Sequence, residues 1–248
     1  MASSDGDQNR SKCCFLKWMK TQEEDLSELL QTLNLNSNNE AELTQLAQKA
    51  VKQFQYYIDE RYQLACNDVP PFFAPTWCSP WENSLLWIGG CRPSSFFRLI
   101  YVLVGLEIES QLTEILQGTL LTGALGKMSS KQLVLVDCLR RKTISEEESL
   151  TSMVAGLQED IADQPVAVIA TGLCRLGELT GEVDKVLDEH EKAMVGVLEG
   201  ADKLRMNTFK ELLNVLTPLQ AIHFIAASKK LHLCVHEWGN KRDRKHVQ

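Results

Sequence analysis

Apolar residues recur at helical spacing along nearly the whole chain, and this pattern constrains the fold more than any other feature. They lie three or four positions apart in segment after segment, and no convincing run of alternating apolar and polar residues marks a strand. The expected helices are long and their joints short, which is typical of near-antiparallel bundles. We therefore predict an all-α fold, a single multi-helix bundle of about eight helices.

Capping residues and breaks in the periodicity set the helix boundaries. Asn39 is an expected N-cap, and Ser79 and Thr217 each precede a proline and should cap the next helix. Glu82 can close a capping box with Ser79, and a break near Ser145 stays open. A loop is expected over residues 117–128. We expect helices over residues 12–33, 40–67, 80–89, 94–116, 129–163, 165–200, 201–216 and 217–238.

The segment 69–80 differs in kind from the rest of the chain. Four prolines break any helix there, while Phe72, Phe73 and Trp77 are too apolar for a free linker. A role as a ligand for a proline-reading module is the alternative. We expect an ordered, extended segment that lies across the helices.

Charge and composition exclude several classes of protein. The formal net charge is -7, which disfavours direct binding to nucleic acid. No run of ~18 apolar residues predicts a membrane span, and the first ten residues lack the apolar region of a secretory signal. The basic residues within 241–245 are either a solvated helix end or a nuclear-import signal.

Motif searches indicate no enzyme. The chain lacks the phosphate loop, the dinucleotide-binding fingerprint, the zinc-protease motif and the nucleophile elbow. The eight cysteines are scattered without a C-x-x-C pair, which fits reduced thiols and argues against a structural zinc site. We expect no catalytic residue.

His232 and His236 are the sharpest candidate site. Their i, i+4 spacing places both imidazoles on one face of the last helix, beside an apolar stripe. Such a pair can bind a metal or supply a haem ligand, or it can simply border a buried stripe. Two histidines on adjacent turns of one helix cannot reach opposite faces of one porphyrin. One of them is then the ligand, or the second axial ligand comes from elsewhere.

The start of the first helix is a candidate docking edge. Phe15, Leu16 and Trp18 give an amphipathic helix near the chain end an aromatic anchor, which suits a partner groove. The alternative is that these residues pack on their own bundle.

Three blocks of sequence then resemble a known family. Residues 73–80 and 87–99, the latter with the motif Trp-x-Gly-Gly-x-Arg-Pro-Ser, resemble the signature of the plant Delay of Germination domain. Residues 201–205, which lead into 216–221, are similar to the C-terminal half of the TGA class of plant bZIP transcription factors, which share this domain. The resemblance implies a flexible N-terminus over 1–10, the domain over 11–244 and a tail over 245–248.

The resemblance also implies a biology. Because no basic region and zipper precede the domain, the chain looks like the stand-alone branch, which is implicated in seed dormancy and abscisic-acid signalling. Haem bound through His232 or His236, and type 2C protein phosphatases bound through Phe15, Leu16 and Trp18, are the implied cofactor and partners. Haem iron would be the only metal. A phenylalanine and a lysine replace the tyrosine and glutamate of the family's contact motif, which can change partner choice.

Other expectations follow from the same branch. A homodimer is compatible with it, and nucleus and cytoplasm are the expected compartments. A DNA-associated role in transcription, by analogy with TGA factors, is one alternative function. A stress-response or pollen-patterning role within the family is another.

Overall fold

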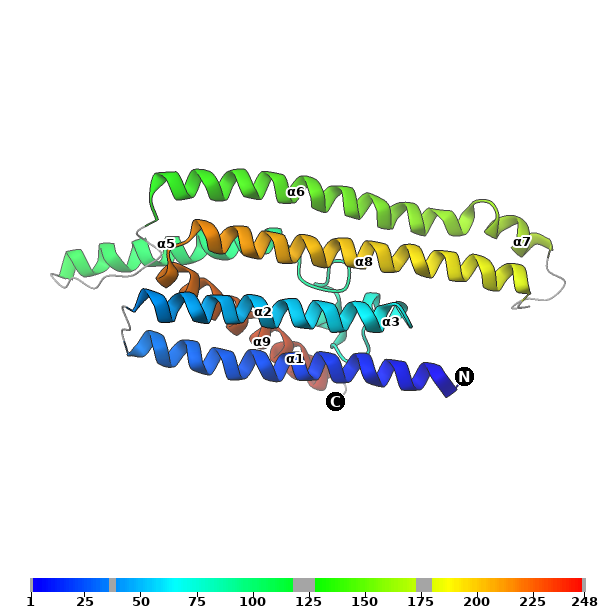
Figure 1. Ribbon diagram of the computed structural model, residues 1–248, viewed down its shortest axis with the longest axis horizontal. Helices are drawn as coiled ribbons and strands as arrows, with labels where there is room; N and C mark the ends of the chain where they lie inside the picture. The colour runs from blue at the N-terminus through cyan, green and yellow to red at the C-terminus, as the bar shows by residue number, and fades with distance from the viewer. Residues whose placement is uncertain (1, 36–38, 118–127, 173–179, 247–248) are drawn as a thin grey trace.

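Four long helices lie side by side along the molecule, and a fifth crosses them (Figure 1). The four are α1 (Ala2–Asn34), α2 (Glu40–Ala65), α6 (Ser130–Glu159) and α8 (Gly181–Val215), and α9 (Pro218–His246) packs against α1 and α2. The all-α prediction is confirmed. This computed structural model describes residues 2–35, 39–117, 128–172 and 180–246.

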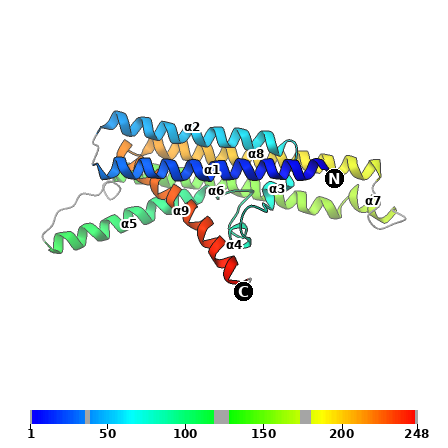
Figure 2. The same ribbon diagram turned by 90° about the horizontal axis from the view of Figure 1, so that it is seen from below.

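Shorter elements complete the fold. They are α3 (Pro70–Phe73), α4 (Pro80–Asn83), α7 (Val166–Gly172) and a 3-10 turn over Asp160–Ala162, while α5 (Ser94–Gln117) is longer. Figure 2 shows α5 and the C-terminal part of α9 leaving the bundle in different directions. α4 packs against α9, so the proline-rich part of the chain is joined to the last helix.

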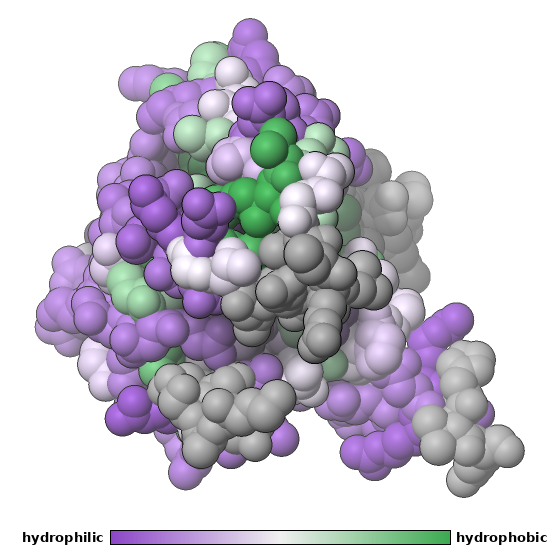
Figure 3. Space-filling view, turned by 90° about the vertical axis from the view of Figure 1, so that its right-hand side faces the viewer, coloured by the Kyte–Doolittle hydropathy of each residue, from purple (hydrophilic) through white to green (hydrophobic). Residues whose placement is uncertain are grey.

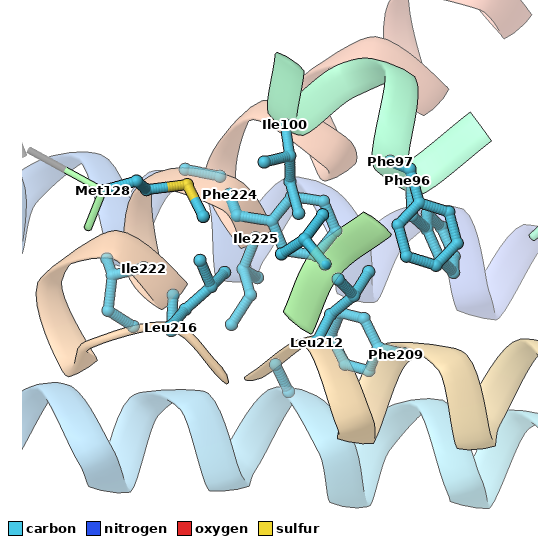
Figure 4. Close-up of a cluster of buried hydrophobic side chains, with 14 of the residues drawn as sticks. Phe96, Phe97, Ile100, Met128, Phe209, Leu212, Leu216, Ile222, Phe224 and Ile225 are labelled. Atoms are coloured by element: carbon cyan, nitrogen blue, oxygen red, sulfur yellow. The ribbon is translucent and has the colours of Figure 1, made fainter. Parts of the chain in front are cut away.

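The main core lies where α5, α8 and α9 meet (Figure 4). Phe97, Ile222 and Phe224 are fully buried there, and the rings of Phe209 and Phe224 lie 6.2 Å apart. Burying each such side chain contributes roughly 1.5–3 kcal/mol. This core fixes α9 relative to α8, and thereby positions the histidines farther along α9.

Several predicted boundaries are wrong. α8 runs without interruption through Gly200, where a break was expected; the glycine faces α6, and a Cβ there would lie 3.0 Å from Leu150 Cδ2. α1 begins at Ala2 rather than near Lys12, and α9 continues past Trp238. α6 shows no break near Ser145, and the single helix expected over 165–200 is instead α7 and the first part of α8.

The proline–aromatic segment is ordered, but it is not extended throughout. Pro70 and Pro71 occupy the first turn of α3, where the missing N–H groups have no intrahelical partner to lose. Phe72 is buried and Trp77 is half-buried, so the segment packs on the bundle as expected.

The expected caps are confirmed, although one helix is shorter than predicted. The Asn39 side chain accepts from Ala41 N and Glu42 N, and Ser79 Oγ accepts from Glu82 N at 3.0 Å. Thr217 and Gln220 exchange side-chain and backbone hydrogen bonds at the start of α9. α4 ends at Asn83 instead of near Gly89, and the predicted loop over 117–128 lies almost wholly outside the described residues.

The surface is mostly hydrophilic, as seen from the end of the bundle where α7 lies (Figure 3). The strongest hydrophobic colour gathers near the centre of this view among polar residues, and smaller pale-green areas lie elsewhere on the same face. Among the described residues, no helix is long and apolar enough to cross a membrane.

Candidate ligand-binding cavity

A cavity of about 400 Å³ lies between α1, α2, α5, α8 and α9. This volume is within the ~300–1,000 Å³ typical of pockets for small ligands. The loop after α4 and the segment around Trp77 close one side of it. Its walls are rich in aromatic rings, contributed by Phe15, Trp18, Phe54, Tyr57, Phe72, Trp77, Phe96 and Phe209. A ligand here would meet mainly apolar surface.

His232 lines this cavity. Burial, together with the nearby charges of His236 and Lys229, lowers the pKa of His232 to about 4. Its imidazole is therefore neutral at physiological pH, which is the form that coordinates a metal. Within the described part of the chain, we find no hydrogen-bond partner for His232.

His236 has a different environment one turn later. Its Nδ1 lies 2.7 Å from Glu82 Oε2, and its Nε2 lies 3.2 Å from Asn240 Nδ2. An amide nitrogen can only donate, so Nε2 accepts and Nδ1–H donates to the buried Glu82 carboxylate. The Glu82 side chain thus binds His236 rather than closing a capping box. His236 is used to join α9 to α4 and is not among the cavity-lining residues.

The candidate docking edge on α1 is divided between the interior and the surface. Phe15 is buried against Trp77 and His236, and Trp18 stacks on Tyr57 with ring centroids 4.5 Å apart. Both side chains line the cavity. They therefore pack on their own bundle, which was the alternative to a docking edge. Leu16 faces outward and is 49% exposed.

Two buried arginines on the cavity wall were not identified from the sequence. Arg205 Nη1 donates to Asp202 Oδ1 at 2.6 Å, and Arg61 Nε lies 3.4 Å from Asp202 Oδ2. All three residues are almost fully buried. The i, i+3 spacing of Asp202 and Arg205 on an otherwise apolar helix face was the available signal. Arg61 gave none, because it follows two acidic residues in a segment that reads as solvated.

Arg205 packs against the glycine pair of the family motif, where a Cβ on Gly90 would lie 2.9 Å from Arg205 Cζ. Its Nε donates to Cys91 O at 2.8 Å, and its Nη2 donates to Ile88 O at 2.9 Å and to Trp87 O. Gly89 has a φ of +65°, and a Cβ there would lie 2.6 Å from the Phe72 carbonyl oxygen. The close approach of the loop to its neighbours therefore requires glycine.

A second buried polar cluster joins α1 to α9. Lys229 Nζ donates to Asp25 Oδ2 at 3.0 Å and to Gln22 Oε1 at 3.1 Å. Asp25 also meets Lys49 Nζ at 3.3 Å and Gln53 Nε2 at 3.0 Å. These contacts hold α1 over the cavity, to which Gln22 and Lys229 contribute polar wall.

Comparison with known proteins accounts for the shared blocks. The family model DOG1, described as seed dormancy control, matches residues 25–102. The chain is 37% identical over 254 residues to Protein DOG1-like 1 of Arabidopsis thaliana, covering 95% of this chain and 90% of that one. The chain belongs to the DOG1 family. Protein DOG1-like 3 from the same plant is also 37% identical, over 98% of this chain and 88% of its own length.

The relationship to TGA factors is more distant. Transcription factor TGA2 of Arabidopsis thaliana is 25% identical over 85% of this chain, which spans 58% of that protein. The DOG1 family assignment supports a regulatory role in a plant. The residue blocks singled out by resemblance therefore pointed to the correct family.

Proposed function

We propose that this DOG1-family chain is a non-enzymatic regulator of seed dormancy and abscisic-acid signalling, which acts through protein–protein contact and binds haem in the cavity. The family description supports the dormancy role. A relative named RESPONSE TO ABA AND SALT 1, 26% identical over 88% of this chain, supports a link to the hormone and also a stress-response alternative. Nucleus and cytoplasm are the proposed compartments.

The environment of His232 carries the haem proposal. The neutral imidazole of His232 faces an aromatic cavity, and no hydrogen bond from a described residue occupies its ring nitrogens, so it would be able to offer a lone pair to haem iron. Bound haem supplies an iron atom that can change oxidation state and bind small ligands. Phe15 and Trp18 would cover the ring, and Arg61 offers a cation to its propionates. His236 would act as a positioning residue, since both its ring nitrogens are already hydrogen-bonded.

Haem titration of the full chain tests this assignment. We expect a Soret band that is lost or strongly shifted in His232→Ala. In His236→Ala the band should persist, because that histidine is not a ligand. His190→Ala, on the distant half of α8, is the matched control and should behave as wild type. A Soret band that depends on His236 alone, or no band at all, would refute the proposal.

For the partner, we propose that a type 2C protein phosphatase contacts the outer face of α1. Leu16 and Lys17 are exposed there, side by side in the sequence. Phe15 and Trp18 would support this edge from inside rather than reach the partner. Deleting the first twenty residues would also remove buried Phe15 and Met19, so a point substitution is the cleaner test.

Pull-down of the phosphatase with Leu16→Asp measures the contact. We expect binding to fall at least tenfold while thermal stability stays near that of wild type. Leu135→Asp, at an exposed position on α6, should leave binding unchanged. Equal losses in the two variants would show that the α1 edge is not the docking surface.

A DNA-associated role in transcription is the second candidate, favoured by the relationship to TGA2. The net charge of -7 opposes direct contact with phosphates. A gel shift with the isolated chain should therefore show, at most, binding that modest salt abolishes. Salt-resistant, sequence-specific binding would favour this second role.

A further inference from the structure

Arg61 and Arg205 share one carboxylate beside the cavity, and this imbalance suggests what the cavity holds. We propose that the cavity binds an apolar ligand that carries a carboxylate, and that Arg61 receives this anionic group. The inference rests on the proposed function in so far as haem, with its propionates, is one such ligand. It extends to other ligands of the same chemistry and does not require iron.

The charges around Asp202 do not balance. Arg61 is 4% exposed and Arg205 is 2% exposed, and an arginine stays protonated in proteins. Asp202, 3% exposed, supplies a single negative charge between them. Glu82 is the other carboxylate among the described residues that line the cavity, and it accepts a hydrogen bond from His236. The Asp202 cluster itself thus holds two guanidinium groups and one carboxylate, while Glu82 is hydrogen-bonded to His236 rather than to either arginine, so an anion beside Arg61 would stabilise the cluster.

Hydrogen-bond donors are in excess as well. Arg205 uses its guanidinium on Asp202 and three loop carbonyls. By contrast, Arg61 Nε and Nη2 are buried with no hydrogen-bond partner among the described residues, although both arginines line the cavity. Gln22 Nε2, also from a cavity-lining residue, is in the same state, since Lys229 uses only the Gln22 oxygen. Unused donors call for a ligand that brings acceptor oxygens.

The rest of the cavity wall determines how polar the remainder of the ligand can be. This wall is rich in aromatic rings. Besides the two arginines, the buried cation among the described lining residues is Lys229, and Asp25 already neutralises it. A ligand that is polar throughout would lose its hydration without new partners. The ligand is therefore amphipathic, with one acidic end at Arg61 and an apolar remainder against the rings.

Two sources share this chemistry, a porphyrin with propionates and a simple organic acid with an apolar chain. Four probes separate them in titrations of the full-length protein: iron-free protoporphyrin IX, its dimethyl ester, dodecanoate and dodecanol. Quenching of Trp18 and Trp77, which line the cavity, reports binding, with porphyrin emission as a second signal. We expect at least one acid to bind about tenfold or more tightly than its neutral partner. If neither acid binds more tightly than its neutral partner, the proposal is wrong.

Variants then assign the preference to Arg61. Arg61→Met leaves Asp202 and Arg205 as a balanced pair, and should abolish the preference for the acid. Arg61→Lys should keep part of it, and Arg141→Met, which removes an exposed charge from α6, should keep all of it. An undiminished preference in a folded Arg61→Met protein would overturn the assignment. If that variant does not fold, the wild-type comparison of acid and ester still decides.

The same probes distinguish this inference from the haem proposal. Iron-free porphyrin and dodecanoate cannot coordinate through His232, so His232→Ala should leave the acid preference intact. A preserved acid preference without any Soret band would refute haem binding alone. A Soret band that depends on His232, combined with equal binding of acids and neutral probes, would refute the carboxylate site alone.

Discussion

Two buried ionic clusters border the cavity, and they differ in what they hold. The loop cluster consists of Asp202, Arg205 and the loop 87–91. Arg205 donates to backbone carbonyls of this loop, in which Ile88 and Gly89 have positive φ angles. The helix cluster consists of Gln22, Asp25 and Lys229, which bind one another through side chains alone. In the first, Asp202 also has Arg61, but the loop carbonyls depend on Arg205 as their side-chain donor; in the second, Asp25 also has Lys49 and Gln53. The loop cluster thus specifies the fold, while the helix cluster attaches one wall of the cavity.

The largest effect is expected from Arg205→Met. Asp202 keeps Arg61, but the loop carbonyls of Ile88 and Cys91 lose their side-chain donor and Trp87 O keeps only Gly90 N, so the free energy of unfolding should fall by about 3–5 kcal/mol. Chemical denaturation measures this, with Arg141→Met expected within about 0.5 kcal/mol of wild type. A loss below about 1 kcal/mol would mean that the loop is held by something else.

Gly89→Ala should come next. The positive φ and the 2.6 Å approach of a Cβ to Phe72 O should destabilise the protein by about 1–3 kcal/mol. Gly196→Ala is the matched control, because a Cβ there meets nothing within 4 Å and the helix gains about 0.5–1 kcal/mol. Thermal unfolding of both variants should show shifts of opposite sign. Shifts of the same sign would contradict the special role of Gly89.

Lys229→Met tests the helix cluster. Because Asp25 retains Lys49 and Gln53, we expect a loss of about 1–2 kcal/mol, less than for Arg205→Met. The Asp25→Asn, Lys229→Met double variant should lose less than the sum of the two single variants. A loss equal to that of Arg205→Met would remove the distinction between the clusters.

The smallest effect is a pH dependence from His232. Its pKa falls from an ordinary value of about 6.5 to about 4 on folding, so the unfolded chain binds more protons between these values. This contribution to stability is complete above pH ~6.5 and is lost as the pH falls toward 4. His232→Gln should flatten the dependence of the melting temperature on pH in this window. Because Lys229 helps to lower this pKa, Lys229→Met should raise it in an NMR titration.

The sequence by itself determined the local features of this protein. Helical spacing and the caps at Asn39, Ser79 and Thr217 depend on neighbours in the chain, and all of them are present in the structure. The shared blocks identified the DOG1 family. The i, i+4 spacing also placed His232 and His236 on one helix face, and the geometry of one helix ruled out a joint axial pair.

Only the tertiary structure decided which residues face the cavity. His232 and His236 differ by about 40° around the helix axis, and it is contact with Glu82 of α4 that separates their roles. Gly200 looked like a helix end, but its function is set by Leu150 of α6. Arg61 sits in a charged segment that reads as solvated, and it is buried because α8 brings Asp202 to it. In each case the deciding partner is far away in sequence, so no local pattern records it.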